Sequence, residues 1–167
     1  MKQHFKIVSV AASLAVVVAQ TFSQGRAAGI TRLGDEDKQH LLAKDKFRAV
    51  LRVKQLPRSV RGWFAQRATG RTSYLADPGQ KYQAGCIVEK GSAPRRLLFA
   101  GVADDHCFVH YEKGGRGHSY HVVLFRLSGN EARLTWHGVA KRKMASLDQL
   151  RQSIAANDLS DELNYGY

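Results

Sequence analysis

Hydrophobic and polar residues alternate along the middle of the chain, over residues 95–140. Glycines at 114, 115, 117 and 129 interrupt the alternation where tight turns need residues without a Cβ. Short runs rich in Val, Phe, Tyr and Leu lie between these turns, at residues 96–102, 106–112, 118–127 and 131–138. Runs of this length and composition are typical of β-strands. The pattern therefore predicts an antiparallel meander over residues 95–140.

The turn lengths also predict the strand alignment, with Glu112 opposite His118 and Leu127 opposite Glu131. One sheet face then collects large apolar residues: Phe99, Phe108, Tyr120, Val122, Leu124, Leu134 and Trp136. The other face is mixed: Val109, Tyr111, His121, Val123, Phe125, Arg133, Thr135 and His137. The apolar face must be covered, and the apolar members of the mixed face suggest a homodimer or a third layer. A slip of one residue would exchange the two faces.

Two amphipathic segments flank the meander and are predicted to be helices that cover it. The first begins with the acidic residues 35–37, which suit a helix N-terminus, and keeps one-sided apolar spacing to about Val53, before Pro57. The second begins at Ser146, which fits a capping box with Gln149.

The remaining segments complete one α+β domain. Residues 60–70 are interpreted as a short helix or an irregular segment, and residues 82–89 as a further strand. The predicted fold is a four- to five-stranded, mainly antiparallel sheet whose N-terminal and C-terminal helices pack on one face.

The first 28 residues have the pattern of a secretory signal peptide. Lys2 and Lys6 precede an apolar stretch, 7–19, that is shorter than the roughly 20 residues of a membrane-spanning helix. An uncleaved anchor or a buried helix is the alternative. We interpret residues 1–28 as a cleaved signal of bacterial type and residues 29–167 as a single domain. The protein is then periplasmic or extracellular and is not an integral membrane protein.

The chain has two cysteines, Cys86 and Cys107. An even number of cysteines in an exported protein favours a disulfide. We predict a bond between Cys86 and Cys107; the alternative is two buried free thiols.

Basic residues are concentrated between residues 46 and 76, in a chain of net charge +12. This span has eight basic residues and no acidic one, and it interleaves aromatic residues with the cations. Cations attract polyanions, and aromatic side chains add stacking or insertion. The residues predicted to bind are Arg52, Lys54, Arg58, Arg61, Trp63, Arg67 and Arg71. The alternative is a basic surface that only keeps the protein soluble, with Trp63 in the core.

Five of the seven histidines lie in the meander. The predicted alignment places His121 across from His137, with Arg133 near them. Two neighbouring imidazoles and an arginine could transfer protons on a phosphodiester and stabilise its charge. A metal would need a third ligand, which this pair lacks, so no metal or cofactor is predicted. Histidines that only bond to their neighbours are the simpler interpretation. Asp104 and Asp105 are interpreted as turn residues.

No motif of a known catalytic class is present: the chain has no H-E-x-x-H, no G-x-S-x-G, no P-loop and no dinucleotide-type glycine pattern. We therefore predict a non-enzymatic, exported binding protein whose partner is an anionic polymer, an anionic lipid or an acidic protein; an inhibitor of a secreted enzyme belongs to this class. The alternative is a small secreted ribonuclease-like hydrolase that uses His121 and His137.

Overall fold

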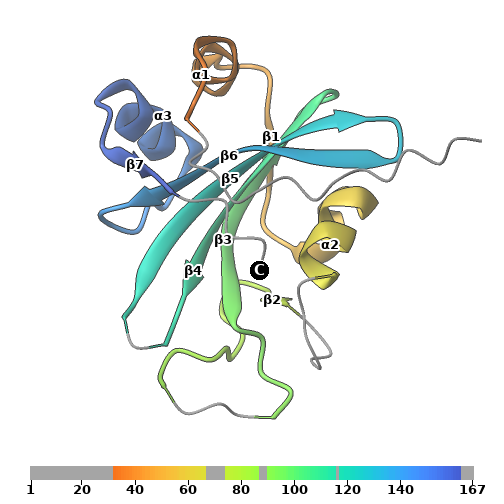
Figure 1. Cartoon of the computed structure of the whole chain (residues 1–167), viewed down its shortest axis with the longest axis vertical. Helices are drawn as coiled ribbons and strands as arrows, with labels where there is room; N and C mark the ends of the chain where they lie inside the picture. Colours follow the sequence, from red (N-terminus) through yellow and green to blue (C-terminus); the bar gives the residue numbers. More distant parts are fainter. Residues whose placement is uncertain (1–31, 67–73, 87–89, 116, 163–167) are drawn as a thin grey trace, which may run out of the picture.

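A computed structural model describes residues 32–66, 74–86, 90–115 and 117–162 (Figure 1). In chain order the elements are α1 (Asp35–Leu42), β1 (Arg48–Val50), the 3-10 turn η1 (Val53–Gln55), α2 (Arg58–Ala65), β2 (Leu75–Ala76), β3 (Arg95–Val102), β4 (His106–Lys113), β5 (Ser119–Ser128), β6 (Glu131–Ala140), α3 (Leu147–Ala155) and β7 (Leu159–Asp161). The predicted α+β class is confirmed. The predicted signal peptide, 1–28, lies outside the described residues. None of the described helices has the length and apolar character needed to cross a membrane.

The sheet is mostly antiparallel and is built around the predicted meander, β3 to β6. Its strand order is β1-β3-β4-β5-β6-β7, and β2 pairs in parallel with β3. The predicted count of four to five strands is too low, because the sheet has seven. The additional strands are β1, β2 and β7, which have only two or three residues each. Strands this short show no alternating pattern that a sequence can reveal.

Both predicted strand alignments are displaced. Glu112 lies opposite Tyr120, two residues beyond the predicted position, so every side chain of this pair keeps its predicted face. Next to the second turn, Ser128 rather than Leu127 lies opposite Glu131. This shift of one residue exchanges the faces near the turn.

A β-bulge in β6 restores the predicted faces further along the strand. Leu124 pairs with Trp136 whereas Phe125 pairs with Leu134, so Thr135 is the extra residue. Trp136 therefore lies on its predicted face. Leu134, which precedes the bulge, packs instead against the cluster that contains Phe125. The prediction for Leu134 is wrong because a bulge leaves no mark in the apolar pattern.

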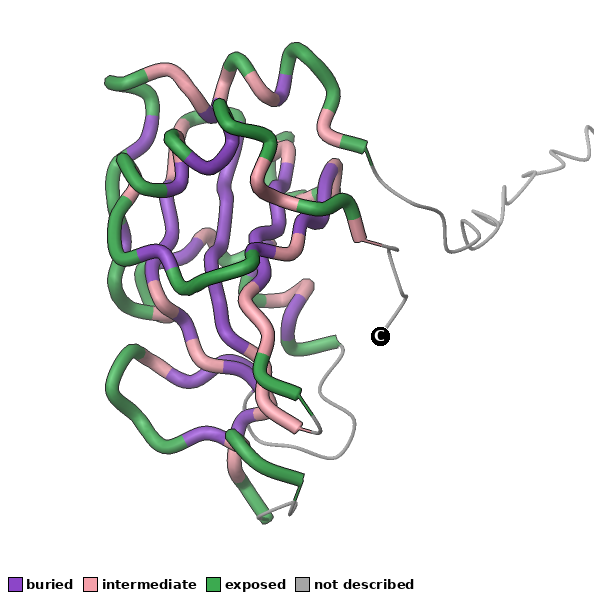
Figure 2. The backbone as a smooth tube through the Cα atoms, turned by 90° about the vertical axis from the view of Figure 1, so that its left-hand side faces the viewer, coloured by how far each residue is buried: buried purple, intermediate pink, exposed green. Residues whose placement is uncertain are grey.

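Both faces of the sheet are buried (Figure 2). Leu41 of α1 and Leu150 of α3 join one core cluster, which also contains Trp136. Val60 and Phe64 of α2 join the cluster on the other face. The helix α2 is thus the third layer that the mixed face required (Figure 1), and a dimer is not needed to cover that face.

The first helix is shorter than predicted. It ends at Leu42, and the following residues lead into β1, which pairs with the end of β3. Phe47 and Val50, which fitted a helical spacing, are buried in different core clusters. The two are three residues apart, so they share a helix face but point to opposite sides of an extended segment. The predicted helix to Val53 is therefore wrong.

The last helix agrees with its predicted start. Ser146 is the N-cap of α3, and its hydroxyl accepts a hydrogen bond from the Gln149 backbone N–H at 3.3 Å. The Gln149 side chain bonds back to the Ala145 N–H at 2.8 Å. This reciprocal arrangement is a variant of the capping box. By contrast, residues 82–86 form no strand, and residues 87–89 of that prediction lie outside the described ones.

Both cysteines are free, so the predicted disulfide is wrong. Cys107 is fully buried near the start of β4, where burial raises the pKa of its thiol to about 12. Cys86 is exposed and follows Ala84, whose carbonyl accepts a hydrogen bond from Gly115, just past the other end of β4. A strand rises about 3.4 Å per residue, so most of the length of β4 separates the two thiols. A disulfide requires Cα atoms within about 7 Å.

Candidate functional site

The predicted binding residues lie on the segment that runs from β1 through α2. In α2, Val60 and Phe64 face the core, while Arg58 and Arg61 are exposed on the opposite side. This division follows from helical spacing, because residues three or four apart share a face. We call the predicted binding residues that the structure describes the basic surface: Arg52, Lys54, Arg58, Arg61 and Trp63. Two further predicted residues, Arg67 and Arg71, lie outside the described residues.

Trp63 is partly core and partly surface. Its ring contacts Phe64 and Phe125 edge to face, with 5.0 Å between centroids in each case. The ring is half-buried and packs against the cluster beneath α2. The alternative prediction, Trp63 in the core, is therefore correct for one side of the ring. The other side lines a surface hollow.

This hollow lies between α2 and the turn that joins β5 to β6, and has a volume of about 620 Å³. Arg58 and Trp63 line it from the helix, and Gly129 and Glu131 from the turn. Among the described residues, Glu131 is the one acidic residue in the lining. The volume lies within the range of small-ligand pockets. The hollow can therefore accept an anionic group beside an aromatic wall.

The two predicted catalytic histidines are in direct contact. His121 Nδ1 lies 3.0 Å from His137 Nε2, and both side chains are buried. They are diagonal neighbours on β5 and β6, because His121 pairs with Val139 and His137 with Val123. Ser119 adds a third member to this row of polar contacts, because its Oγ lies 2.8 Å from His121 Nε2. The prediction did not include Ser119, although its spacing of two residues from His121 places both on one strand face.

The environment of this pair keeps His121 neutral. Burial lowers the pKa of His121 to about 3, and the nearby His137, Lys113 and Arg95 act in the same direction. The His121 ring also stacks on Tyr111, with 5.1 Å between centroids and 12° between planes. A general base works best with a pKa near the working pH, so His121 is a weak base in this arrangement.

Arg133 does not accompany the histidine pair. It is exposed and pairs with Arg126, whose guanidinium bonds to α1 on the opposite sheet face. Directly paired residues share a face. The bulge at Thr135 causes this change, because it reverses the side of every residue between the bulge and the turn.

Two other meander histidines have structural contacts. His110 is fully buried; its Nδ1 bonds to the His121 carbonyl at 2.9 Å and its Nε2 accepts from the Met144 N–H at 3.3 Å. Burial lowers the pKa of His110 to about 4. His118 Nε2 lies 2.7 Å from a carboxylate oxygen of Glu112. His110 and His118 therefore fit the simpler interpretation, in which a histidine only bonds to its neighbours.

Comparison with protein-family models, with curated proteins and with solved structures finds no match to this chain. Function must therefore be inferred from the arrangement of its own residues.

Proposed function

We propose that this protein is an exported, non-enzymatic binding protein that uses the basic surface to hold an anionic envelope component or an acidic partner protein. The observation that carries the proposal is the combination of exposed cations and a hollow. Arg58 and Trp63 line a space of about 620 Å³, and Arg52, Lys54 and Arg61 are exposed on the same continuous segment.

Physical chemistry supports an anionic ligand at this place. Within the hollow, Glu131 is the one acid among the described lining residues; outside it, the Asp77 carboxylate accepts a hydrogen bond from the Val53 N–H, between Arg52 and Lys54. An exposed cation near an anionic membrane surface contributes about 1 kcal/mol to binding. Trp63 is held by the core, so its exposed side is a rigid wall that loses little freedom on binding.

The test compares two charge-matched double variants in binding to vesicles that contain an anionic phospholipid, to a sulfated glycan and to an acidic protein. R58A/R61A removes two cations of the basic surface. K141A/R142A removes two exposed cations from the segment between β6 and α3. At about 1 kcal/mol per residue, R58A/R61A should bind roughly tenfold or more weakly, while the control stays close to the unmodified chain.

Equal losses in both double variants would contradict the proposal, because net charge alone would then explain binding. Binding that does not weaken between low and high salt would also contradict it, since exposed charges are screened. The preferred probe among the three identifies the class of partner.

A second proposal, a ribonuclease-like hydrolase, is favoured by the 3.0 Å contact between His121 and His137. Ser119, His121 and His137 also follow the order of nucleophile, base and orienting group. Two features rank it second: the low pKa of His121 and the position of Arg133 on the other sheet face. Hydrolysis of RNA that is unchanged in the folded variants H121A and H137A would eliminate it.

A further inference from the structure

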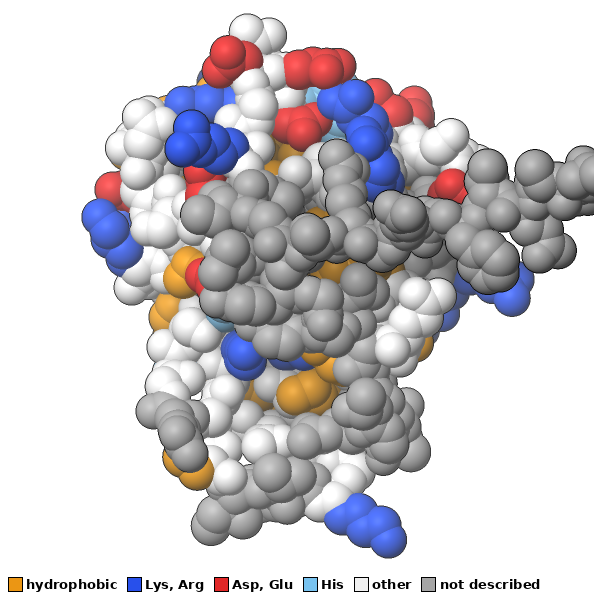
Figure 3. All heavy atoms as spheres, viewed as in Figure 1, with side chains coloured by type: hydrophobic (Ala, Val, Ile, Leu, Met, Phe, Trp, Pro, Cys, Tyr) orange, Lys and Arg blue, Asp and Glu red, His pale blue; other side chains and the backbone are white. Residues whose placement is uncertain are grey.

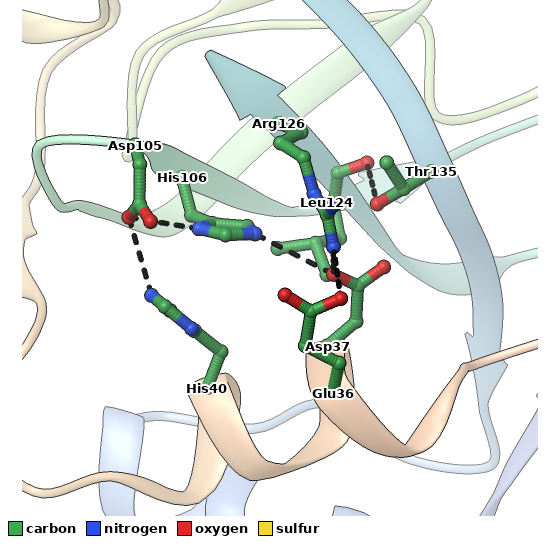
Figure 4. A network of polar contacts seen from close by, with 8 residues as sticks. All are labelled: Glu36, Asp37, His40, Asp105, His106, Leu124, Arg126 and Thr135. Carbon is green, nitrogen blue, oxygen red and sulfur yellow. Dashed lines mark hydrogen bonds and ion pairs between the residues drawn. The ribbon is translucent and has the colours of Figure 1, made fainter.

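A group of titratable side chains that neither proposal uses lies where α1 meets the turn before β4 (Figure 4). His40 comes from the last turn of α1, Asp105 from the turn just before β4, and His106 is the first residue of β4. His40 Nε2 lies 3.2 Å from Asp105 Oδ1, and His106 Nδ1 lies 2.8 Å from the same oxygen. The two imidazole centroids are 4.0 Å apart. We call these three residues the α1 site.

Salt bridges hold α1 in the position that forms this group. Arg126 of β5 donates to Glu36 at 3.0 Å and to Asp37 at 2.9 Å (Figure 4). One turn of helix separates Asp37 from His40, so this anchor also places the His40 ring beside His106. The position of His40 is therefore set by the docking of α1 on the sheet.

His106 is buried with a carboxylate beside each ring nitrogen, yet neither nitrogen makes a hydrogen bond among the described residues. It is only 3% exposed, and neither ring nitrogen has a hydrogen-bond partner in the part of the chain that the structure describes. Carboxylate oxygens of Asp105 and Asp37 lie 2.8 and 3.4 Å from its nitrogens and pair with the ring when it is protonated, but neither contact has hydrogen-bond geometry. An unsatisfied buried polar group costs roughly 1–3 kcal/mol, which is uncommon without a functional or ligand-related reason.

We propose that His40, Asp105 and His106 bind a divalent transition-metal ion of the zinc class. Two imidazoles and one carboxylate form a ligand set that leaves coordination positions free for water or a substrate group. Metal bonds of 2.0–2.2 Å in a tetrahedral site place neighbouring ligand atoms about 3.3 Å apart. The contacts of 2.8 and 3.2 Å are near this separation, and all three ligand atoms lie within 4.8 Å of one another.

Asp37 supplies the outer contact that metal-binding histidines usually have. It lies 3.4 Å from His106 Nε2, while Nδ1 is the nitrogen that faces Asp105. A carboxylate beside the second nitrogen favours the tautomer that carries its proton there. With a metal at Nδ1 and Asp37 beside Nε2, each nitrogen of this buried imidazole would have a partner.

The α1 site opens into a surface cavity of about 810 Å³. His40 and Asp105 line this cavity together with the carboxylates of Asp45 and Asp104. Lys46 and Arg48 also line it and can attract an anionic group to a bound metal. Figure 3 shows acidic side chains gathered at the α1 end of a chain that is otherwise strongly basic.

The test uses the full chain without a histidine tag, stripped of metal by a chelator and titrated with Zn²⁺ by calorimetry and with Co²⁺ by absorption spectroscopy. We expect one tightly bound ion per chain. The Co²⁺ absorption spectrum should be that of an ion with a low coordination number, because the protein supplies three ligands and leaves the other positions open. H40A and D105A should each weaken binding by more than about tenfold, because even outer contacts are worth 10- to 100-fold.

Asp104→Ala is the matched control, since it removes an adjacent carboxylate of the same cavity that is not one of the proposed ligands. His118→Ala removes an exposed histidine elsewhere. Both should bind as tightly as the unmodified chain. Absence of tight binding to the folded chain, or equal losses in D104A and D105A, would overturn the proposal. Thermal unfolding of each variant establishes that it is folded.

Discussion

Each end of β4 buries one titratable side chain, and the two side chains differ in their hydrogen bonds. Glu112 is 2% exposed at one end and His106 is 3% exposed at the other. Glu112 accepts hydrogen bonds from Arg96 Nε at 2.6 Å and contacts His118 Nε2 at 2.7 Å, one partner for each oxygen. His106 has carboxylates nearby and no hydrogen bond to either nitrogen among the described residues.

This difference separates a structural network from a candidate ligand site. Burial by itself would raise the pKa of Glu112, but hydrogen bonds from Arg96 and His118 outweigh burial and lower it. A buried charge with all its partners strengthens one conformation of the protein. The buried imidazole of His106 has carboxylates beside both nitrogens but no hydrogen bond among the described residues, and this contrast is the physical basis for assigning the metal to the His106 end.

Glu112→Gln should produce the largest effect. The change keeps the shape of the side chain but removes the charge from two charge-assisted hydrogen bonds, which typically contribute about 1.5–3 kcal/mol each. We expect the free energy of unfolding in urea to fall by about 2–3 kcal/mol. Glu131→Gln, at an exposed position in the next turn, is the control and should change it by less than about 0.5 kcal/mol. Similar losses in both variants would remove the contrast between the ends of β4.

The pH dependence of stability should report the same network. The folded pKa of Glu112 is lowered, so its contribution is present above its unfolded pKa, near 4.3, and is lost as pH falls through the folded value. The pKa of Asp37 is shifted in the same direction. Burial raises this pKa, but the hydrogen bond from Arg126 and the other contacts of the carboxylate outweigh burial and lower it. One such group changes stability by at most about 1.4 kcal/mol per pH unit. Urea unfolding between pH 6 and about 3 should therefore show a shallower decline in Glu112→Gln, and equal slopes would exclude a role for Glu112.

Zinc should stabilise the unmodified chain and Glu112→Gln by the same amount. At a free zinc concentration ten times the dissociation constant, binding to the folded state alone adds about 1.4 kcal/mol. The increments should agree because the α1 site and the Glu112 network lie at opposite ends of β4 and share no residue. A smaller increment in Glu112→Gln would show that the two ends are energetically coupled. The measurement is the shift of the unfolding temperature at several zinc concentrations.

His106→Leu should have the smallest effect on the metal-free protein. Replacement of an unsatisfied buried imidazole with an apolar side chain removes a desolvation cost, and Asp37 keeps its hydrogen bond to Arg126. We expect the free energy of unfolding to change by less than about 1 kcal/mol, together with complete loss of zinc-dependent stabilisation. A loss as large as that of Glu112→Gln would show that His106 is structural.

Patterns local to the chain were sufficient for part of this fold. Strand alternation has a period of two residues and depends only on neighbours, so the meander and the faces of Phe108, Val122 and Trp136 could be predicted. The capping of α3 by Ser146 is equally local. The contact between His121 and His137 could also be predicted from the sequence, because an error of two residues in the strand alignment keeps both side chains on one face.

Tertiary structure alone decided the rest, because the relevant contacts join residues that are distant in sequence or depend on a single inserted residue. The bulge at Thr135 sends Arg133 away from the histidine pair, and β4 keeps Cys107 apart from the segment of Cys86. His40 and Asp105 meet across 65 residues through the docking of α1. Local periodicity carries no information on such distances. The sequence by itself therefore determined which side chains share a strand face, whereas packing determined which titratable groups are satisfied and which remain available to a ligand.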